Sequence, residues 1–159
     1  MTDTLSIRPA ARPDAALVME FIHSLAEYER LSHEVGATAE RLEATLFAEP
    51  PAAHCVLAFA GAEPAGFAIF FFNYSTFLAK PGLYLEDLFV KPEHRGRGIG
   101  RALLLHLACI ARERGCGRME WAVLDWNTPA IGFYQSIGAR LMHDWRICRL
   151  AGESLENLR

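Results

Sequence analysis

The chain has no C-x-x-C pair, and its four cysteines, Cys55, Cys109, Cys116 and Cys148, do not share a metal-ligand spacing with its six histidines. Zinc sites and disulfide frameworks are recognised by such spacings, so the sequence predicts free thiols and no bound metal. A signal peptide is also missing at the N-terminus. Together these features favour a cytoplasmic location.

Long apolar runs and an excess of charge are missing as well. The longest apolar run, 65–72, is far shorter than the roughly 20 residues that cross a bilayer. The net charge of -3 gives no broad attraction to nucleic acid. The 159 residues contain no repeat or linker, and their number lies within the usual range for one domain. We therefore expect a single domain over residues 1–159 that binds neither membranes nor nucleic acid.

The chain does contain alternating helix and strand patterns. Apolar residues at helical spacing predict a helix that opens at Pro13 and Asp14, and three more over 39–47, 99–114 and 129–137. The predicted strands cover 5–8, 55–60, 65–74, 83–90, 119–124, 140–142 and 145–150. The sequence therefore predicts an α/β fold with a mixed, twisted central sheet of about six to seven strands, flanked by about four helices.

A glycine-alternating loop leads from the strand over 83–90 into the helix over 99–114. Glycine permits unusual backbone conformations, and a helix N-terminus presents amide groups and a positive dipole end to a phosphate. The loop is not a Walker loop, because no lysine and no Ser/Thr hydroxyl follow Gly100 as that motif requires. It is not a Rossmann fingerprint, because Arg101 stands where a third glycine is needed. A tight turn before a helix would also produce this pattern.

The spacing Arg95-x-x-Gly98-x-Gly100 resembles the R/Q-x-x-G-x-G/A loop of the GNAT superfamily of N-acetyltransferases. Together with 83–90, 126–139 and 145–150, it resembles the diamine branch of that superfamily, the spermidine/spermine and thialysine acetyltransferases. The resemblance covers nearly the whole chain and implies acetyl-CoA as co-substrate, central strands that splay apart around it, and a homodimer. The residues implied to bind acetyl-CoA are Leu88, Phe89, Val90, Arg95, Gly96, Arg97, Gly98, Ile99, Gly100, Arg101, Asn127, Thr128, Pro129 and Ala130.

Acetyl transfer to an amine needs a base for the ammonium, a stabilised oxyanion and a proton for the departing thiolate. Glu86 and Asp87 are the candidate bases, and because a strand alternates its faces, only one can point directly into a cleft. The resemblance favours Glu86, acting directly or through water, and it implies Tyr134 as the acid. From the pattern alone, Glu86 is also consistent with a solvated edge-strand residue and Tyr134 with an apolar helix face.

The same resemblance implies an amine pocket formed by Tyr28, Glu29, Glu86, Asp87, Glu120, Trp121 and Ala122. Carboxylates along a groove complement the separated charges of a polyamine, a diamine or a thialysine-like amino acid. A solvated helix face would also explain Glu29. The sequence predicts an acetyl-CoA-dependent N-acetyltransferase that acts on such a small cationic amine by direct attack. Two alternatives stay open: an acetyltransferase for a protein lysine or N-terminus, and a non-catalytic acyl-CoA-binding domain.

Overall fold

The computed structural model of the protein describes residues 4–159, and the chain forms two compact units that divide between Ala122 and Val123. The α-helices are α1 (Ala15–Tyr28), α2 (Ala39–Leu46), α3 (Ile99–Glu113), α4 (Thr128–Ser136) and α5 (Glu153–Glu156), and single 3₁₀ turns cover Arg12–Asp14, Ser32–Glu34 and Pro92–His94. The strands are β1 (Leu5–Pro9), β2 (His54–Ala60), β3 (Glu63–Ser75), β4 (Lys80–Val90) and β5 (Arg118–Trp121).

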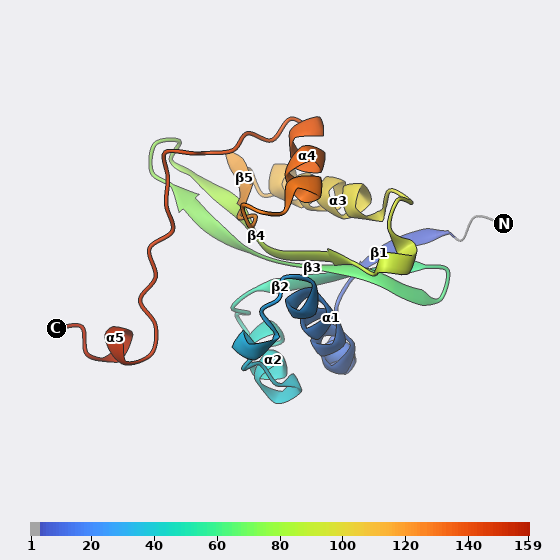
Figure 1. The fold of residues 1–159 in the computed structure, drawn as a ribbon, viewed down its shortest axis with the longest axis horizontal. Coiled ribbons are helices and arrows are strands. Elements are labelled where there is room, and N and C mark those ends of the chain that lie inside the picture. The colour runs from blue at the N-terminus through green and yellow to red at the C-terminus, as the bar shows by residue number, and fades with distance from the viewer. Residues whose placement is uncertain (1–3) are drawn as a thin grey trace. The chain divides into compact units, whose positions relative to one another are not determined.

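The first unit is built on one five-stranded sheet in the order β1-β2-β3-β4-β5 (Figure 1). The first four strands are antiparallel neighbours, whereas β5 runs parallel to β4. A hairpin turn joins β2 and β3 at Gly61, whose φ of +60° glycine adopts without strain. Parallel neighbours need a crossover connection, and α3 supplies it. The predicted α/β fold with a mixed sheet is confirmed, with five strands among the described residues.

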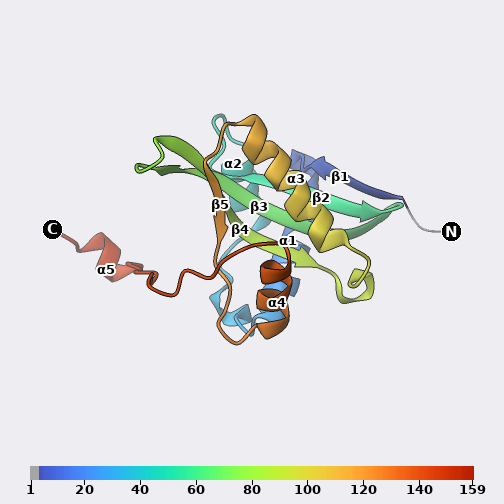
Figure 2. The ribbon, with the colours of Figure 1, turned by 90° about the horizontal axis from the view of Figure 1, so that it is seen from above.

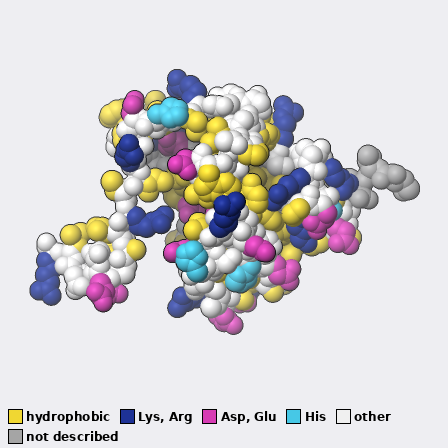
Figure 3. Space-filling model, in the orientation of Figure 1, with side chains coloured by type: hydrophobic (Ala, Val, Ile, Leu, Met, Phe, Trp, Pro, Cys, Tyr) yellow, Lys and Arg dark blue, Asp and Glu magenta, His cyan; other side chains and the backbone are white. Residues whose placement is uncertain are grey.

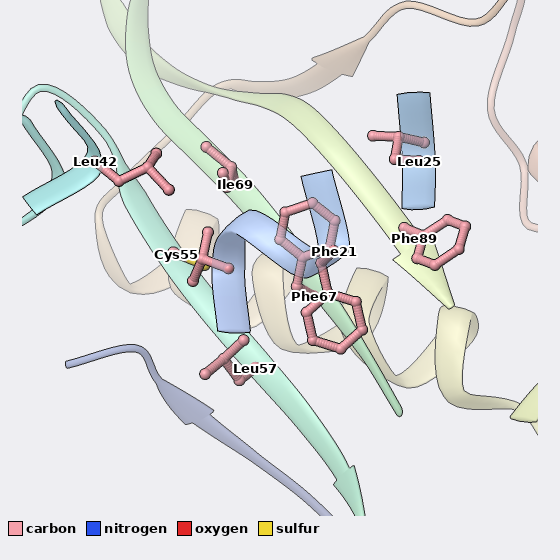
Figure 4. Packing of buried hydrophobic residues seen from close by; sticks show 9 residues of the cluster. Phe21, Leu25, Leu42, Cys55, Leu57, Phe67, Ile69 and Phe89 are labelled. Atoms are coloured by element: carbon pink, nitrogen blue, oxygen red, sulfur yellow. The ribbon is translucent and has the colours of Figure 1, made fainter. Parts of the chain in front are cut away.

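A hydrophobic core lies between the sheet and α1 with α2 (Figure 4). Val18, Phe21 and Leu25 are buried because their spacing places them on one side of α1. The Phe21 ring stacks on Phe67 of β3 at a centroid separation of 5.2 Å and meets Phe89 of β4 edge-on at 6.4 Å. Burying one such side chain stabilises the fold by about 1.5–3 kcal/mol. This packing anchors α1 against β4.

The opposite face of the sheet is covered by α3 (Figures 1 and 2). Leu103 and Leu107, one helical turn apart, are fully buried against it. The helix begins after Gly98, whose φ is +80°, and the chain leaves it through Gly115, whose φ is +67°. Left-handed glycines therefore define both ends of the helix, whose bounds lie close to the predicted range of 99–114.

The second unit contains α4 and the short α5, and no strand forms in the described chain between them. The strands predicted over 140–142 and 145–150 are therefore wrong, and β5 ends at Trp121 instead of 124. An apolar alternation makes a strand only where a neighbour satisfies its backbone groups. Trp145 and Ile147 are 76% and 73% exposed, so this segment buries little apolar surface.

Charged side chains of both signs are spread over the visible face of the molecule (Figure 3). Within residues 4–159, no helix is both long enough and apolar enough to span a bilayer. The expectation of a single domain over residues 1–159 stays a prediction.

Candidate active site

The strand β4 has an open edge beyond the end of β5. The two strands pair only where Gly82–Leu85 of β4 meets β5, whereas β3 accompanies β4 as far as Val90. Residues 86–90 therefore have no strand neighbour on the β5 side in the described part of the chain. Such an edge presents N–H and C=O groups with which an extended ligand can pair. This opening corresponds to the splay between central strands that the resemblance implies.

Leu88 and Val90 present their backbone groups at this open edge. The Phe89 carbonyl faces β3, since its oxygen lies 2.6 Å from where a Cβ on Gly66 would stand. Backbone groups alternate sides along a strand, so those of Leu88 and Val90 face away from β3. Of the three β4 residues predicted to bind acetyl-CoA, two thus have their backbone groups at the open edge, and Phe89 pairs with β3.

A β-bulge interrupts β4 at Glu86. Leu85 pairs with Phe70 and Asp87 pairs with Ile69, so Glu86 is the extra residue of β4. The bulge breaks the strict alternation expected for Glu86 and Asp87. Glu86 is exposed, whereas Asp87 is half-buried. The neighbouring carboxylates therefore have different environments.

Three carboxylates of the first unit, Glu29, Glu86 and Asp87, are called the acidic cluster here, because the charges of Glu86 and Glu29 both act on Asp87. Burial, together with the negative charges of Glu86 and Glu29, raises the pKa of Asp87 to about 6. Burial also raises the pKa of Glu29, which follows the last residue of α1. None of the three forms an ion pair with a described residue. A positively charged ligand would relieve their repulsion.

Tyr84 extends this region, and sequence reasoning missed it. Burial and the charges of Glu86 and Glu120 raise the pKa of Tyr84, which indicates that the two glutamates lie near its ring. Glu120 forms an ion pair of 2.8 Å with Arg118, so its charge is already compensated. A signal for Tyr84 was present in the sequence, because it stands two residues before Glu86 in the same strand.

The remaining predicted pocket residues of the first unit lie at element ends. Tyr28 closes α1 and is 38% exposed. Trp121 pairs with Leu85 at the point where β4 and β5 separate, and Ala122 follows it on the surface. In residues 4–159, no set of three or more His, Cys, Asp and Glu side chains is arranged to hold a metal ion.

The glycine loop has the form of an anion site. Gly96 and Gly98 have φ values of +72° and +80°, and a Cβ at either would meet open space. Gly98 is the N-cap of α3, whose first-turn amides have no intrahelical acceptor. A Cβ on Gly100 would lie 3.8 Å from Val90 and 4.0 Å from Leu88, so the loop packs against the open edge of β4. Exposed amides, room and a positive helix end fit a pyrophosphate.

The other loop residues have distinct environments. Ile99 is buried and holds the start of α3 in the core. Arg97 contacts the ring of His94 at 3.2 Å, and Arg101 is exposed on the first turn of α3. Arg95 contacts the end of β4 and the end of α1. The backbone of the loop, more than its arginine side chains, therefore has the geometry that a phosphate requires.

The second unit holds the last group of predicted residues. Asn127 is the N-cap of α4, and its side-chain oxygen accepts a hydrogen bond from the Ala130 amide at 3.4 Å. Thr128 and Pro129 form the first turn, where the missing N–H of proline is harmless. Tyr134 is half-buried in α4, with its ring 5.6 Å from that of the preceding residue. Asn127 therefore caps α4, and the roles of this turn in acetyl-CoA binding and of Tyr134 in catalysis stay predictions.

A separate cavity of about 310 Å³ lies beside the C-terminal half of α3. Its lining includes His54, Phe72 and Arg114, and none of the acidic cluster. On α3 the lining residue nearest to the glycine loop is His106, which at 1.5 Å per helical residue lies about 12 Å along the axis from Gly98. We therefore place the candidate site at the opening of β4 and not in this cavity.

Comparison with known proteins agrees with the geometry of the loop and the sheet. Residues 19–139 match the acetyltransferase (GNAT) family. The chain belongs to the GNAT family. It is therefore an acyltransferase, and its α/β architecture is the GNAT fold.

Relatives in the diamine branch cover nearly the whole chain. The thialysine N-epsilon-acetyltransferase of Bos taurus is 38% identical over 163 residues, 96% of this chain and 95% of the relative. The L-ornithine N5-acetyltransferase of Arabidopsis thaliana is 33% identical, covering 94% and 86%. A solved integron cassette protein from V. cholerae matches with a TM-score of 0.79 at 29% identity, covering 96% and 95%. The resemblance to the diamine branch of the GNAT family is confirmed.

Proposed function

We propose that the protein is an acetyl-CoA-dependent N-acetyltransferase whose acceptor is a small cationic amine. The main support is the acidic cluster, which includes Glu86 and Asp87 at the point where β4 loses its β5 partner. Carboxylates without a counter-ion attract an ammonium group, and the unpaired strand edge beside them accommodates an extended acyl donor. The family supplies the reaction class, and the cluster supplies the reason for a cationic acceptor.

The acceptor class comprises short diamines, polyamines and lysine-like amino acids such as thialysine. Each carries a second positive charge that one carboxylate can bind while the first amine is acetylated. With a pKa of about 6, Asp87 is mostly ionised at neutral pH and is available for this second charge. The names of the relatives, which refer to thialysine and to ornithine, support an acceptor with more than one charged group.

The donor site is the open edge of β4 together with the glycine loop. The backbone groups of Leu88 and Val90 would pair with the amides of the pantetheine arm, like an added strand. The amides near Gly96 and Gly98 would hold the pyrophosphate at the positive end of α3. The turn over 127–130 is proposed to contact the same donor. These residues would place the thioester beside the acidic cluster.

The reaction we propose is direct attack. Glu86 accepts a proton from the substrate ammonium, directly or through water, and the neutral nitrogen attacks the thioester carbonyl carbon. A backbone N–H of residues 88–90 stabilises the oxyanion as the C–N bond forms. The C–S bond then breaks, and the Tyr134 hydroxyl donates its proton to the departing thiolate. The attacking nitrogen loses its second proton, which restores the Tyr134 hydroxyl and leaves a neutral amide, and Glu86 releases its proton to solvent. No covalent acyl-enzyme is needed, so the cysteines have no role in this mechanism.

Thiol release from acetyl-CoA tests this function. The acceptors are spermidine, spermine, a short diamine, thialysine, lysine and a lysine-bearing peptide. We expect saturable turnover with a small amine, and a fall in kcat of about 10²- to 10⁴-fold in Glu86→Gln, as for loss of a general base. Turnover of the peptide alone would favour a protein-directed enzyme. Tight CoA binding without turnover of any acceptor would favour a non-catalytic acyl-CoA-binding domain.

We also propose that the protein acts as a homodimer in the cytoplasm. The exposed Trp145 and Ile147 offer apolar surface that a second copy would cover. All four cysteines carry free thiols, which is typical of proteins in a reducing compartment. Light scattering should give twice the chain mass of 17.7 kDa, and a monomer mass would contradict the dimer.

A further inference from the structure

Arg95 connects the glycine loop to the end of α1, next to Glu29 of the acidic cluster. Its Nε donates a hydrogen bond of 2.9 Å to the carbonyl of Val90, whose backbone groups face the open edge of β4. Its guanidinium carbon lies 4.9 Å from the centroid of the Tyr28 ring and 5.4 Å from that of Phe89. Tyr28 directly precedes Glu29. One side chain of the loop therefore contacts both the donor edge and the end of α1.

Arg95 makes these contacts without neutralising the cluster. It forms no ion pair with any residue between 4 and 159, and its charge is not among the causes that shift the pKa of Asp87 or Glu29. The guanidinium lies over aromatic rings, whose faces attract a cation. The positive charge thus lies over the rings of Tyr28 and Phe89, and the carboxylates of the acidic cluster stay available for an amine.

We propose that Arg95 is a positioning residue that fixes Tyr28 and Glu29 relative to the open edge of β4. This inference rests on the proposed function, because it relates the contact with Val90 to acetyl-CoA binding and the contact with Tyr28 to amine binding. The hydrogen bond to Val90 holds the donor side, and the aromatic contact with Tyr28 holds the acceptor side. Arg95 acts through these neighbours and is not itself a catalytic residue.

Two substitutions separate the contacts. Arg95→Gln keeps a side-chain N–H that can reach the Val90 carbonyl but loses the planar cation over Tyr28. We expect its KM for acetyl-CoA to stay within about twofold and its KM for the amine to rise about two- to fivefold, the size of an exposed cation–π contact. Arg95→Ala loses both contacts and should raise both KM values. Arg41 of α2 is the matched control, because its guanidinium also donates a hydrogen bond to a backbone carbonyl, that of Gly36 at 2.9 Å. Arg41→Gln should change neither KM.

A double-mutant cycle tests the pairing of Arg95 with Tyr28. Because the ring and the guanidinium act together, Arg95→Gln combined with Tyr28→Leu should raise the amine KM no more than the larger single effect. Independent effects that multiply would overturn the proposal, and so would an Arg95→Gln variant that raises only the acetyl-CoA KM. Thermal denaturation verifies that each variant is folded.

A calorimetric CoA titration separates failure of this inference from failure of the proposed function. The titration measures the affinity for CoA in the absence of an amine. Arg95→Ala should bind CoA more weakly than the wild type. Equal affinity would overturn the donor half of the proposal even if turnover is normal. A wild type that binds CoA but acetylates no small amine would instead refute the proposed function, and with it the acceptor half.

Discussion

Replacing Asp87 with asparagine should stabilise the fold at neutral pH while weakening amine binding. Asp87 is the half-buried carboxylate whose pKa is raised to about 6 by burial and by Glu86 and Glu29. An acid whose pKa is higher in the folded state than in the unfolded chain makes the fold less stable as the pH rises from the unfolded pKa to the folded pKa. Asparagine has nearly the same shape and no charge, so it removes this destabilisation where the carboxylate would be ionised.

The magnitude follows from the size of the shift. A rise from the ordinary 3.8 to about 6 corresponds to roughly 3 kcal/mol, at about 1.4 kcal/mol per pKa unit. Part of this gain is lost because the new amide needs hydrogen-bond partners, which leaves a net stabilisation of about 1–2 kcal/mol at about pH 8. For a chain of 159 residues, this corresponds to a rise in Tm of about 2–8 °C.

Thermal denaturation of the wild type and Asp87→Asn between about pH 4.5 and about pH 8 measures the effect. The difference in Tm should grow as the pH rises from the ordinary pKa of 3.8 to about 6 and should level off above that, and the exposed control Glu63→Gln should show no such growth. In the wild type, the amine KM should fall as the pH rises through about 6, because Asp87 of the folded protein gains its charge there. Asp87→Asn should lose that fall. A difference in Tm that is independent of pH, or a lower Tm at pH 8, would refute the reasoning.

Three further substitutions test other residues. Tyr134→Phe should lower kcat by about ten- to a thousandfold while CoA affinity, measured by calorimetry, stays unchanged, and full activity would remove Tyr134 as the acid. Gly98→Val forces a β-branched residue into a φ of +80° and should weaken CoA binding about tenfold or more, so unchanged binding would contradict the anion site. Gly66→Ala should lower the free energy of unfolding in urea by about 1–3 kcal/mol, because a Cβ there would lie 2.6 Å from the backbone carbonyl oxygen of Phe89; an unchanged midpoint would contradict this packing.

The helices could be predicted because apolar periodicity and end signals coincide in the same segments. Thr38 caps α2 through a hydrogen bond from the Arg41 amide, and left-handed glycines mark both ends of α3. The closing strands could not be predicted in the same way. The apolar residues of 145–150 alternate like those of a strand, but whether a neighbouring strand is available depends on the rest of the fold.

The loop and the carboxylates of the site could be found from their motif, whereas their environments could not. The bulge at Glu86 depends on how β3 pairs with β4, which no local pattern determines. The contact between Arg95 and Tyr28 joins segments that are far apart in the sequence. The raised pKa of Asp87 likewise depends on burial by several elements at once. These are tertiary properties, so the sequence suggested which residues matter but not how they interact.

A competition experiment tests the central claim most directly. The protein and acetyl-CoA are added to an equimolar mixture of thialysine, spermidine, a short diamine and a lysine-bearing peptide, and the products are identified by mass spectrometry. We predict that the acetyl group appears on a small amine and that Asp87→Asn reduces its preference over the peptide. Acetylation of the peptide alone, or of no acceptor, would contradict the assignment of the acidic cluster as a pocket for a small cationic amine.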